Sequence, residues 1–469
     1  MSVLQILTAT VLLLCHIVFA ETIGFVPPQS WENINYKRSI DVSNSYIKEL
    51  AEITIKNIGD KPADRYYLSI PTEVFNKVSV FSASLSDVNA YIESALVPEI
   101  VNVSGSLEVS YGLIKLPAPI QPHKDVTITI TYAYNQGTEP YPKHIDLGED
   151  QHILLTTNSL PISAYETKAY VLEFTGSSSF SELVQDSTIS GMEEGDKYIY
   201  GPYENIGAFE FDEPVKMIYR HNLPLPRVTH LSRSAWVSHW ASTLQFEEYY
   251  ELINDAAALK SGFSRATYMK EQHALKPSSH LVALDMTLPP NSEDHYFTDL
   301  VGMVSTSRVL GDHFFLKPRY PIIGSWKYNF TIGWTNQLSQ FLHVDNQESN
   351  VFVLSVPVLN GPMDTFYDTV EMSVFLPEGS EILDVESPIP IIRTKIDNQK
   401  SYFDLNRGHV KVTVDFKNAI DAISNGELIV RYKYTKAAFF KKPLSIAIYI
   451  FIALTALFFL KQVDLTIKK

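Results

Sequence analysis

An apolar run near the C-terminus, PLSIAIYIFIALTALFFL at Pro443–Leu460, limits the folds that this chain can adopt. From Leu444 onward the run has no charge, Gly or Pro, and its 17 residues span roughly 26 Å as a helix. Only a helix satisfies its own backbone polar groups in lipid. The run therefore predicts one transmembrane helix, which with its flanks covers residues 441–461. The alternative is a buried core helix, but Lys442 and Lys461 on either side argue against burial.

The N-terminus predicts a secretory signal peptide over residues 1–20. Its apolar core is followed by Val18 and Ala20, the small residues that precede a cleavage site. A cleaved signal and a late membrane helix place the body of the chain outside the cytosol and leave a short cytosolic tail at 462–469. The single cysteine, Cys15, lies inside the signal, so the mature chain forms no disulfide. A body without disulfides favours an organelle lumen over the cell surface.

The body between the signal and the helix is acidic and rich in aromatic residues. A chain of 469 residues is too long for one core, and its 26 Tyr and 25 Phe favour strands. The first 20 residues carry no charge and the last 29 carry +4, so the net charge of −15 leaves −19 on the body. Such a surface argues against nucleic acid as a partner. An ordinary solvated surface is enough to explain the negative charge of the body.

Segments that alternate between apolar and polar residues recur along the body and predict strands. The clearest is DVTITITYAY at Asp125–Tyr134, which follows the turn-rich segment Pro117–Lys124. The two prolines of NLPLPR, Asn222–Arg227, predict a domain boundary. We therefore predict a mainly β chain with two tandem β-sandwich-like lumenal domains, 21–225 and 226–440, followed by one C-terminal transmembrane helix.

The two halves of the body also resemble each other by pattern, at an offset of about 200 residues. Pro119-Ile120 leads into one predicted strand as Pro321-Ile322 leads into another. His152–Phe174 resembles Phe352–Phe375 in the same way. These matches predict an internal duplication. Chance similarity between β-rich segments is the alternative.

No sequence motif of a known enzyme class is present: GxGxxG, a P-loop, HExxH, GxSxG and an EF-hand loop are all missing. The segment Gly262–Ala266 lacks the last Gly of a nucleophile elbow, and we interpret His239 as structural. Glu247 and Glu248 are adjacent on a predicted strand, so they face opposite ways, and we interpret them as solvated surface. We predict no catalytic residue, cofactor or metal site.

The chain has five tryptophans, Trp31, Trp236, Trp240, Trp326 and Trp334. Tryptophan rings suit a groove that binds carbohydrate or peptide, although packing in the core is their commoner use.

Two kinds of site are predicted from short patterns. The sequons Asn102-Val103-Ser104 and Asn329-Phe330-Thr331 predict N-glycosylation of Asn102 and Asn329, and Asn329 must then face solvent from its strand. Unmodified surface asparagines are the alternative. In the membrane helix, small residues would permit a partner helix to approach closely. These predicted packing residues are Ala447, Ala453, Thr455 and Ala456.

A series of short segments occurs in a specific order and spacing from the end of the first half to the membrane helix. These segments are Tyr200–Tyr203, Val237–Trp240, Gly262–Arg265, Val304–Ser307, Pro318–Pro321, Gly324–Lys327, Leu376–Gly379, Tyr402–Asp404 and Val430–Tyr432. In these segments the chain resembles the ribophorin I family, a non-catalytic subunit of the oligosaccharyltransferase of the endoplasmic reticulum. The first half matches in position and in its strand-rich character.

Two departures from the family pattern limit what the resemblance implies. Only Lys461–Lys469 follows the helix, which resembles the fungal form and removes a cytosolic docking domain from the expectation. Met303 stands where some relatives have a sequon asparagine, so glycan positions are taken from Asn102 and Asn329 alone.

The resemblance implies a subunit that supports en bloc transfer of an oligosaccharide from dolichyl pyrophosphate to the Asn of Asn-X-Ser/Thr in nascent proteins. Catalysis would belong to a separate multi-spanning subunit, since one helix cannot build a membrane-embedded site. The implied partners are the other subunits, nascent polypeptides and membrane lipid. The implied location is the endoplasmic reticulum membrane, as a single-pass type I protein with a lumenal body. The residues leave open a free-standing lumenal lectin or cargo receptor, and a hydrolase with an unrecognised site.

Overall fold

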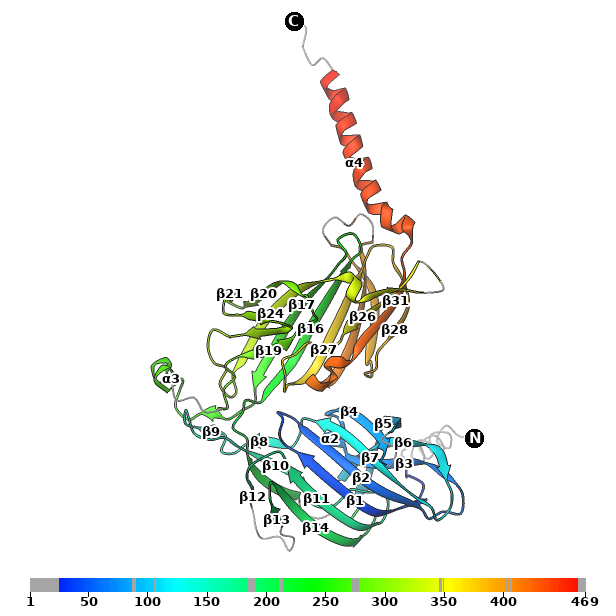
Figure 1. The fold of residues 1–469 in the computed structure, drawn as a ribbon, viewed down its shortest axis with the longest axis vertical. Coiled ribbons are helices and arrows are strands. Elements are labelled where there is room, and N and C mark those ends of the chain that lie inside the picture. Colours follow the sequence, from blue (N-terminus) through cyan, green and yellow to red (C-terminus); the bar gives the residue numbers. More distant parts are fainter. Residues whose placement is uncertain are drawn as a thin grey trace, which may run out of the picture.

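The computed structural model describes residues 25–86, 90–104, 107–183, 191–210, 214–271, 278–345, 348, 350–401, 404 and 407–462. The predicted signal at 1–20 and residues 463–469 of the predicted tail lie outside these ranges. Strands dominate the described chain from β1 (Trp31–Asp41) to β31 (Glu427–Lys433), and one long helix, α4 (Lys436–Gln462), follows them (Figure 1). The prediction of a mainly β chain that ends in one apolar helix is confirmed.

The first half of the body folds into two facing sheets. The larger has ten strands in the order β13 (Met192–Glu194), β14 (Lys197–Ile206), β11 (Thr167–Thr175), β1, β2 (Ile47–Asn57), β7 (Asp125–Tyr134), β4 (Val78–Leu85), β5 (Ala90–Ser104), β6 (Leu107–Ile120) and β3 (Ala63–Pro71). The smaller has β12 (Phe180–Glu182), β15 (Pro214–Arg220), β10 (His152–Asn158) and β8 (Thr138–Pro140). A short helix, α2 (Thr72–Phe75), precedes β4. Ile40 and Ile130 of the larger sheet share one buried core with Leu155 and Met217 of the smaller.

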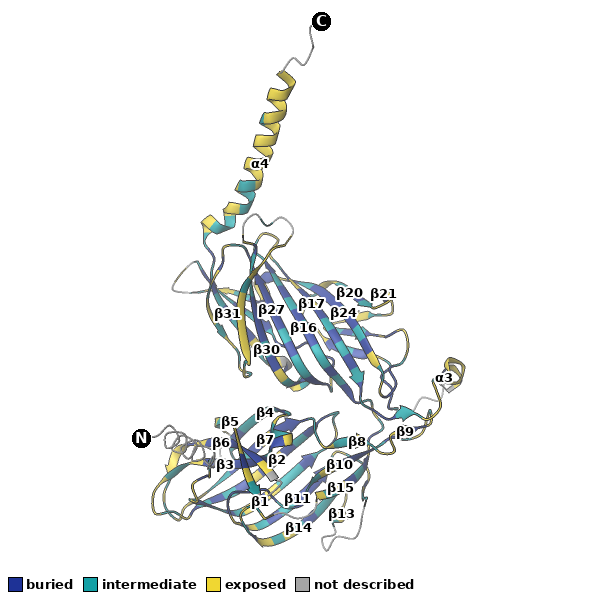
Figure 2. Ribbon diagram, turned by 180° about the vertical axis from the view of Figure 1, so that it is seen from behind, coloured by how far each residue is buried: buried dark blue, intermediate teal, exposed yellow. Residues whose placement is uncertain are grey.

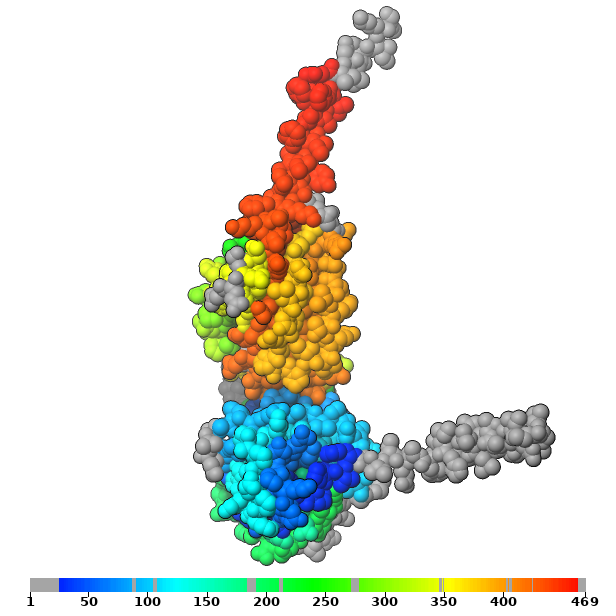
Figure 3. All heavy atoms as spheres, turned by 90° about the vertical axis from the view of Figure 1, so that its right-hand side faces the viewer, coloured from blue at the N-terminus to red at the C-terminus, as the bar shows by residue number. Residues whose placement is uncertain are grey.

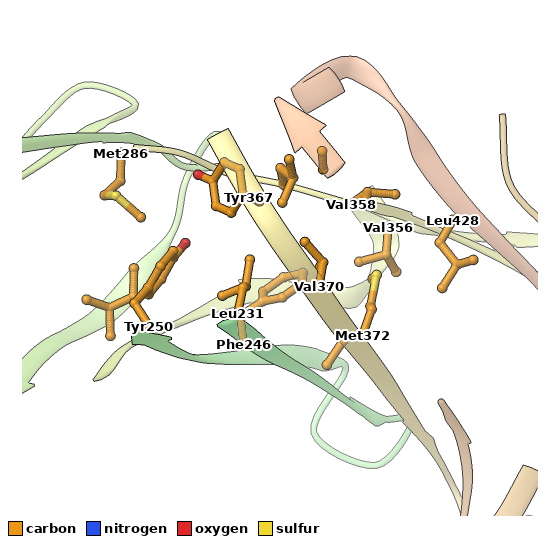
Figure 4. Close-up of a cluster of buried hydrophobic side chains, with 14 of the residues drawn as sticks. Leu231, Phe246, Tyr250, Met286, Val356, Val358, Tyr367, Val370, Met372 and Leu428 are labelled. Carbon is orange, nitrogen blue, oxygen red and sulfur yellow. The ribbon is translucent and has the colours of Figure 1, made fainter. Parts of the chain in front are cut away.

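The second half is built in the same way. Its larger sheet has eight strands in the order β21 (Gly302–Met303), β20 (Glu293–Asp299), β24 (Lys327–Gln337), β17 (Thr243–Asn254), β16 (Pro226–Ser238), β27 (Phe366–Leu376), β30 (His409–Ile420) and β29 (Arg393–Gln399). The smaller has β25 (Leu342–Val344), β26 (Val351–Pro357), β31 and β28 (Glu381–Glu386). Figure 4 shows Leu231, Phe246 and Val370 of the larger sheet in one core with Val356 and Leu428 of the smaller.

A small sheet, a short helix and two 3-10 turns also belong to the second half. A separate sheet contains β19 (Leu284–Thr287), β23 (His313–Leu316) and β22 (Arg308–Leu310). A helix, α3 (Arg265–Glu271), begins inside the segment Gly262–Ala266, which lacks the last Gly of a nucleophile elbow. Two 3-10 turns lie at Leu338–Gln340 and Asp421–Asn425.

The two halves share one topology. In the first, β1 pairs antiparallel with β2 and parallel with β11; in the second, β16 pairs antiparallel with β17 and parallel with β27. The next neighbours, β7 and β24 on one side and β14 and β30 on the other, also correspond. The smaller sheets match strand for strand, β12-β15-β10-β8 against β28-β31-β26-β25. The predicted duplication is therefore confirmed, and we call residues 31–220 the first repeat and 226–433 the second repeat.

One buried asparagine recurs at the end of the second strand of each repeat. Asn57 donates from Nδ2 to the carbonyl of Ile120 at 2.8 Å, and Asn254 donates to the carbonyl of Ile322 at 3.0 Å. Each asparagine also accepts from the backbone N–H two residues further on, and each is fully buried. The isoleucines are those of the two Pro-Ile pairs, so the sequence pattern and the side-chain bonding repeat together.

The turn between β1 and β2 joins the first repeat to the second. The Asp364 carboxylate accepts from the N–H of Ser45 and from the Asn44 amide, both at 2.9 Å. Tyr46 donates to Asp421 at 2.7 Å, and its ring lies within the core of the second repeat. A second junction pairs β9 (His144–Ile145) in parallel with β18 (Ala258–Leu259). Figure 3 shows the repeats stacked along the long axis, with α4 beyond the second.

Acidification is expected to weaken the fold through His221, which follows β15 at the boundary between the repeats. Burial lowers the pKa of His221 from 6.5 to about 4, because a charged ring would lose its hydration. The unfolded chain then binds the extra proton, so stability is complete above pH 6.5 and falls toward pH 4, by a total of about 3 kcal/mol. Thermal unfolding of the native chain and of His221→Gln between pH 7 and 4.5 measures this effect. The variant should lose less Tm on acidification, and an equal loss in both would contradict the assignment.

Candidate functional site

The C-terminal helix continues almost directly from the last strand. Two residues, Tyr434 and Thr435, separate β31 from α4. No residue of α4 is buried, and the helix is long and apolar enough to cross a membrane (Figure 2). Its 27 residues span about 40 Å. The first turns of α4 extend beyond the apolar run toward the second repeat, so helix and repeat meet without a flexible linker.

The root of α4 is attached to the second repeat by a ring stack and an ion pair. Phe439 stacks on Trp240, in the turn between β16 and β17, with ring centroids 4.3 Å apart. The Lys442 ammonium lies 2.7 Å from the buried Asp404 carboxylate, which also pairs with His409 at 2.9 Å. Burial by itself raises the pKa of Asp404, but the bonds from Lys442, the N–H of Ser401 and His409 lower it below its usual value. Asp404 therefore stays charged and fixes the direction in which the helix leaves the repeat.

His239 belongs to the same attachment. Its Nε2 lies 2.7 Å from the Tyr432 hydroxyl, and its ring packs against Phe352 and Tyr434. Burial lowers the pKa of His239 to about 4, so the ring is neutral at physiological pH. This packing supports the interpretation of His239 as structural, which stays a prediction.

The four predicted helix-packing residues lie on α4, where no part of the body covers them. By helical spacing Ala453 and Ala456 are about 60° apart and share a face, whereas Ala447 and Thr455 lie toward other sides of the helix. The Thr455 hydroxyl donates back to the carbonyl of Phe451 at 2.7 Å, so its polar group is satisfied within the helix. Packing by these residues stays a prediction, and the spacing singles out the pair Ala453 and Ala456.

The two sequon asparagines are both on the surface. Asn102 is exposed on β5. Asn329 is half-buried on β24 and donates from Nδ2 to the Tyr249 hydroxyl at 3.0 Å. Thr331, two residues further along β24, points to the same side of the sheet. Glycosylation of both asparagines stays a prediction, and it would place the second glycan on the outer face of the eight-stranded sheet.

The tryptophans divide between core and surface. Trp31 and Trp334 are buried, and the half-buried Trp326 packs against the core of the second repeat. Trp240 is 54% exposed. Trp236 faces away from the core on β16, so the common use of tryptophan in core packing applies to some of the five and not to all.

Trp236 lines a groove of about 520 Å³ on the outer face of the eight-stranded sheet. Polar side chains from β17 and β20 line the same groove, and the Tyr296 hydroxyl donates to Glu247 at 2.7 Å. Thr335 of β24 also borders it and lies on the same face as Asn329, six residues away and roughly 20 Å along the strand. An aromatic ring beside carboxylates and hydroxyls suits a polar chain such as a peptide or a sugar.

The interpretation of Glu247 and Glu248 on β17 as solvated surface holds for only one of the two glutamates. Glu247 is exposed, but Glu248 is fully buried and forms an ion pair with Arg233 of β16. The Arg233 guanidinium also lies 4.8 Å from the Phe246 ring and 5.7 Å from the Trp334 ring. Burial lowers the pKa of Arg233 only to about 10, so it keeps its charge. The expectation for Glu248 was wrong because alternation does not tell which of two adjacent residues faces the core.

The first repeat contains a corresponding pair. Arg38 of β1 lies 2.5 Å from Glu49 of β2, and the hydroxyls of Tyr132 and Tyr134 donate to the same carboxylate. The Glu49 carboxylate is buried, and its charge is paired with Arg38 inside the fold. Among the described residues, no group of three or more His, Cys, Asp or Glu is placed to hold a metal ion.

Comparisons with known proteins match nearly the whole of the body and the helix. The family model of ribophorin I matches residues 31–461. A protein of Caenorhabditis elegans is 26% identical over 459 residues, covering 96% of this chain and 74% of its own length. A protein of Schizosaccharomyces pombe is 26% identical over 423 residues, covering 88% and 91%. Both are named dolichyl-diphosphooligosaccharide–protein glycosyltransferase subunit 1. A solved structure of yeast LTA4 hydrolase covers 42% of this chain and 30% of its own, with 9% identity and a TM-score of 0.28, too low to support an argument.

Proposed function

The chain belongs to the ribophorin I family, and we propose that it is a non-catalytic subunit of oligosaccharyltransferase. The observation that carries this proposal is a family match over residues 31–461, which takes in both repeats and nearly all of α4. The relatives from Caenorhabditis elegans and Schizosaccharomyces pombe, which carry the subunit 1 name, agree with it. In this role the chain supports the transfer of an oligosaccharide from dolichyl pyrophosphate to the Asn of Asn-X-Ser/Thr in nascent proteins.

The catalytic step belongs to another subunit in this proposal. The buried carboxylates Glu49, Glu248 and Asp404 are each engaged by a cation of this chain. A general base or nucleophile would need a carboxylate that reaches substrate. A single membrane helix also offers no enclosed site for a lipid-linked donor, so a multi-spanning partner must supply it.

The proposed location is the endoplasmic reticulum membrane, with one helix crossing it and the body in the lumen. The proposed partners are the other subunits of the complex, including the multi-spanning catalytic one, together with nascent polypeptides and membrane lipid. The body is proposed to consist of two domains, 21–225 and 226–440. The separate sheets on either side of Asn222–Arg227 support this division.

The outer face of the eight-stranded sheet is the surface we propose for substrate handling. The groove at Trp236 combines an aromatic ring with Gln245, Glu247 and Thr335, which offer hydrogen bonds to an extended peptide. A glycan on Asn329 would lie on the same face and would border that surface. A nascent chain bound on this surface would have its sequon held near the catalytic subunit, and this chain would take no part in the chemical step.

Extraction in mild detergent followed by blue-native electrophoresis tests the proposal. The chain is expected to migrate with a multi-spanning transferase in a complex much larger than itself. A chain that migrates alone, and whose purified body binds free glycans, would instead be a free-standing lectin or cargo receptor.

Bulky residues at the small positions of α4 are expected to weaken assembly. Ala453→Leu combined with Ala456→Leu fills the face on which a partner helix approaches, so the close backbone contact that small residues permit is lost. The recovery of the transferase with the tagged chain should fall about tenfold at limiting concentration. The matched control is Phe458→Leu with Phe459→Leu, which changes as many residues on the same helix. An equal loss with both variants would indicate that α4 anchors the chain in the membrane without packing a specific face against a partner helix.

A further inference from the structure

The membrane end of the second repeat presents a cluster of aromatic side chains to solvent. Trp240 is 54% and Phe440 58% exposed, an unusual state for rings of this size. Phe439 stacks on Trp240, and its centroid lies 5.1 Å from that of Phe440. The three rings, which we call the aromatic collar, are therefore contiguous although they come from a strand turn and a helix far apart in the sequence.

The aromatic collar lies where the chain changes from a folded repeat to an apolar helix. Phe440 is followed by Lys441 and Lys442, and the apolar run begins at Pro443. Tryptophan and tyrosine rings concentrate at the level of the lipid headgroups, phenylalanine occurs on the buried face of helices that lie at this interface, and lysines there extend their ammonium groups toward water. The composition of this boundary is that of a membrane–water interface.

We propose that the aromatic collar rests in the headgroup layer of the bilayer, so that the second repeat is seated on the membrane surface. The occupant of this exposed apolar surface is lipid, because the surface is continuous with α4 at the point where the apolar run begins. Only Tyr434 and Thr435 separate β31 from the helix, and Phe439 and Lys442 are held by the repeat itself. No flexible linker between the second repeat and α4 is therefore available to hold the repeat away from the bilayer.

Because the two repeats share one topology, contact of the second repeat with the membrane would also affect the position of the first repeat. The turn between the first two strands of the first repeat, with Tyr46, is bound to the second repeat. The corresponding turn of the second repeat, with Trp240, is bound to α4. The same turn thus couples each module to the next one toward the helix (Figure 1). Seating at the membrane would consequently fix the height and orientation of the first repeat as well.

A nitroxide label on the turn tests the proposal in the full chain. Cys15 is the single cysteine, so Ala241→Cys in a Cys15→Ser background gives a unique labelling site. Ala241 is exposed beside Trp240, and Ser177→Cys at a half-exposed position of the first repeat gives a comparison site in water. The chain is reconstituted in phosphatidylcholine and phosphatidylethanolamine vesicles, and the accessibility of each label to oxygen and to a water-soluble nickel chelate is measured by power saturation.

The label at 241 is expected to be more accessible to oxygen and less accessible to nickel than the label at 177. Equal accessibilities at the two sites would overturn the proposal. Shielding at 241 that occurs only in the assembled complex would also overturn it, because a protein partner would then cover the aromatic collar. The proposal requires that α4 crosses a membrane but does not depend on the glycosyltransferase role, and its failure would leave co-purification with a transferase unaffected.

A double variant tests the contribution of the rings. Trp240→Ser with Phe440→Ser should raise the nickel accessibility of the label at 241 to the level found at 177. Tyr91→Ser is the matched control, since Tyr91 is 85% exposed on β5 of the first repeat. If the ring variant fails to fold, the comparison of the two labels in the otherwise native chain still decides the proposal.

Discussion

Replacing Arg233 by Met is expected to lower the free energy of unfolding by about 3–5 kcal/mol. Arg233 and Glu248 are both fully buried and paired with each other. Removal of the guanidinium would leave the Glu248 carboxylate charged in a core that water does not reach. Urea unfolding of the chain in detergent, followed by tryptophan fluorescence, measures the loss, and Trp334 reports directly because its ring lies 5.7 Å from Arg233.

Two further variants separate the buried charge from other effects of the substitution. Arg308→Met makes the same chemical change at an exposed position of β22 and should be nearly neutral. Arg233→Met with Glu248→Leu removes both charges and should recover most of the loss, since apolar replacements of buried pairs are often neutral or stabilising. A single-variant loss below about 1 kcal/mol would contradict a charged, paired Arg233 in the core.

Asn254→Ala is expected to destabilise the second repeat by about 3 kcal/mol or more. The Asn254 side chain accepts from the N–H groups of Leu225 and Ala256 and donates to the carbonyls of Ser279 and Ile322. Alanine would leave four backbone groups without this partner in a site that is fully buried. Thermal unfolding and protease sensitivity of the region 222–325 give the readout.

The control for this substitution is Asn398→Ala, at an exposed position of β29. It should change Tm by less than a degree or two, because a surface substitution is usually worth within 0.5 kcal/mol. Asn57→Ala makes the equivalent change in the first repeat and should also be strongly destabilising. If Asn254→Ala were as mild as the control, the repeated asparagine would be incidental to the fold.

The fold was predictable where the signal is local. The period of two in DVTITITYAY marks β7 at the same bounds that the structure has, Asp125–Tyr134. The apolar run gives α4, although the helix begins at Lys436, earlier than the run, because its first turns pack on the second repeat. In contrast, the turn-rich interpretation of Pro117–Lys124 was partly wrong. The strand β6 continues to Ile120, since it pairs there with Ala63 of β3, a contact that no local pattern contains.

The candidate site was less predictable because its contacts join distant segments. Alternation correctly places Glu247 and Glu248 on opposite faces, but only the register of β16 against β17 brings Arg233 opposite Glu248. In the same way Trp240 gives no local signal of exposure. Its role at the root of α4 depends on Phe439, 199 residues away. The repeated topology was visible in the sequence as paired Pro-Ile segments, whereas the asparagine bonds that accompany them were not.

Sequon occupancy after depletion of this chain tests whether the chain acts as an accessory subunit of oligosaccharyltransferase. Cells that lose the protein, and cells rescued with the native chain, are compared by mass spectrometry of secreted glycopeptides, with the fraction of each sequon that carries a glycan as the readout. An accessory subunit of oligosaccharyltransferase predicts under-occupied sequons on many proteins, with glycan structures unchanged where they are attached and with recovery on rescue. Full occupancy in depleted cells would contradict the account.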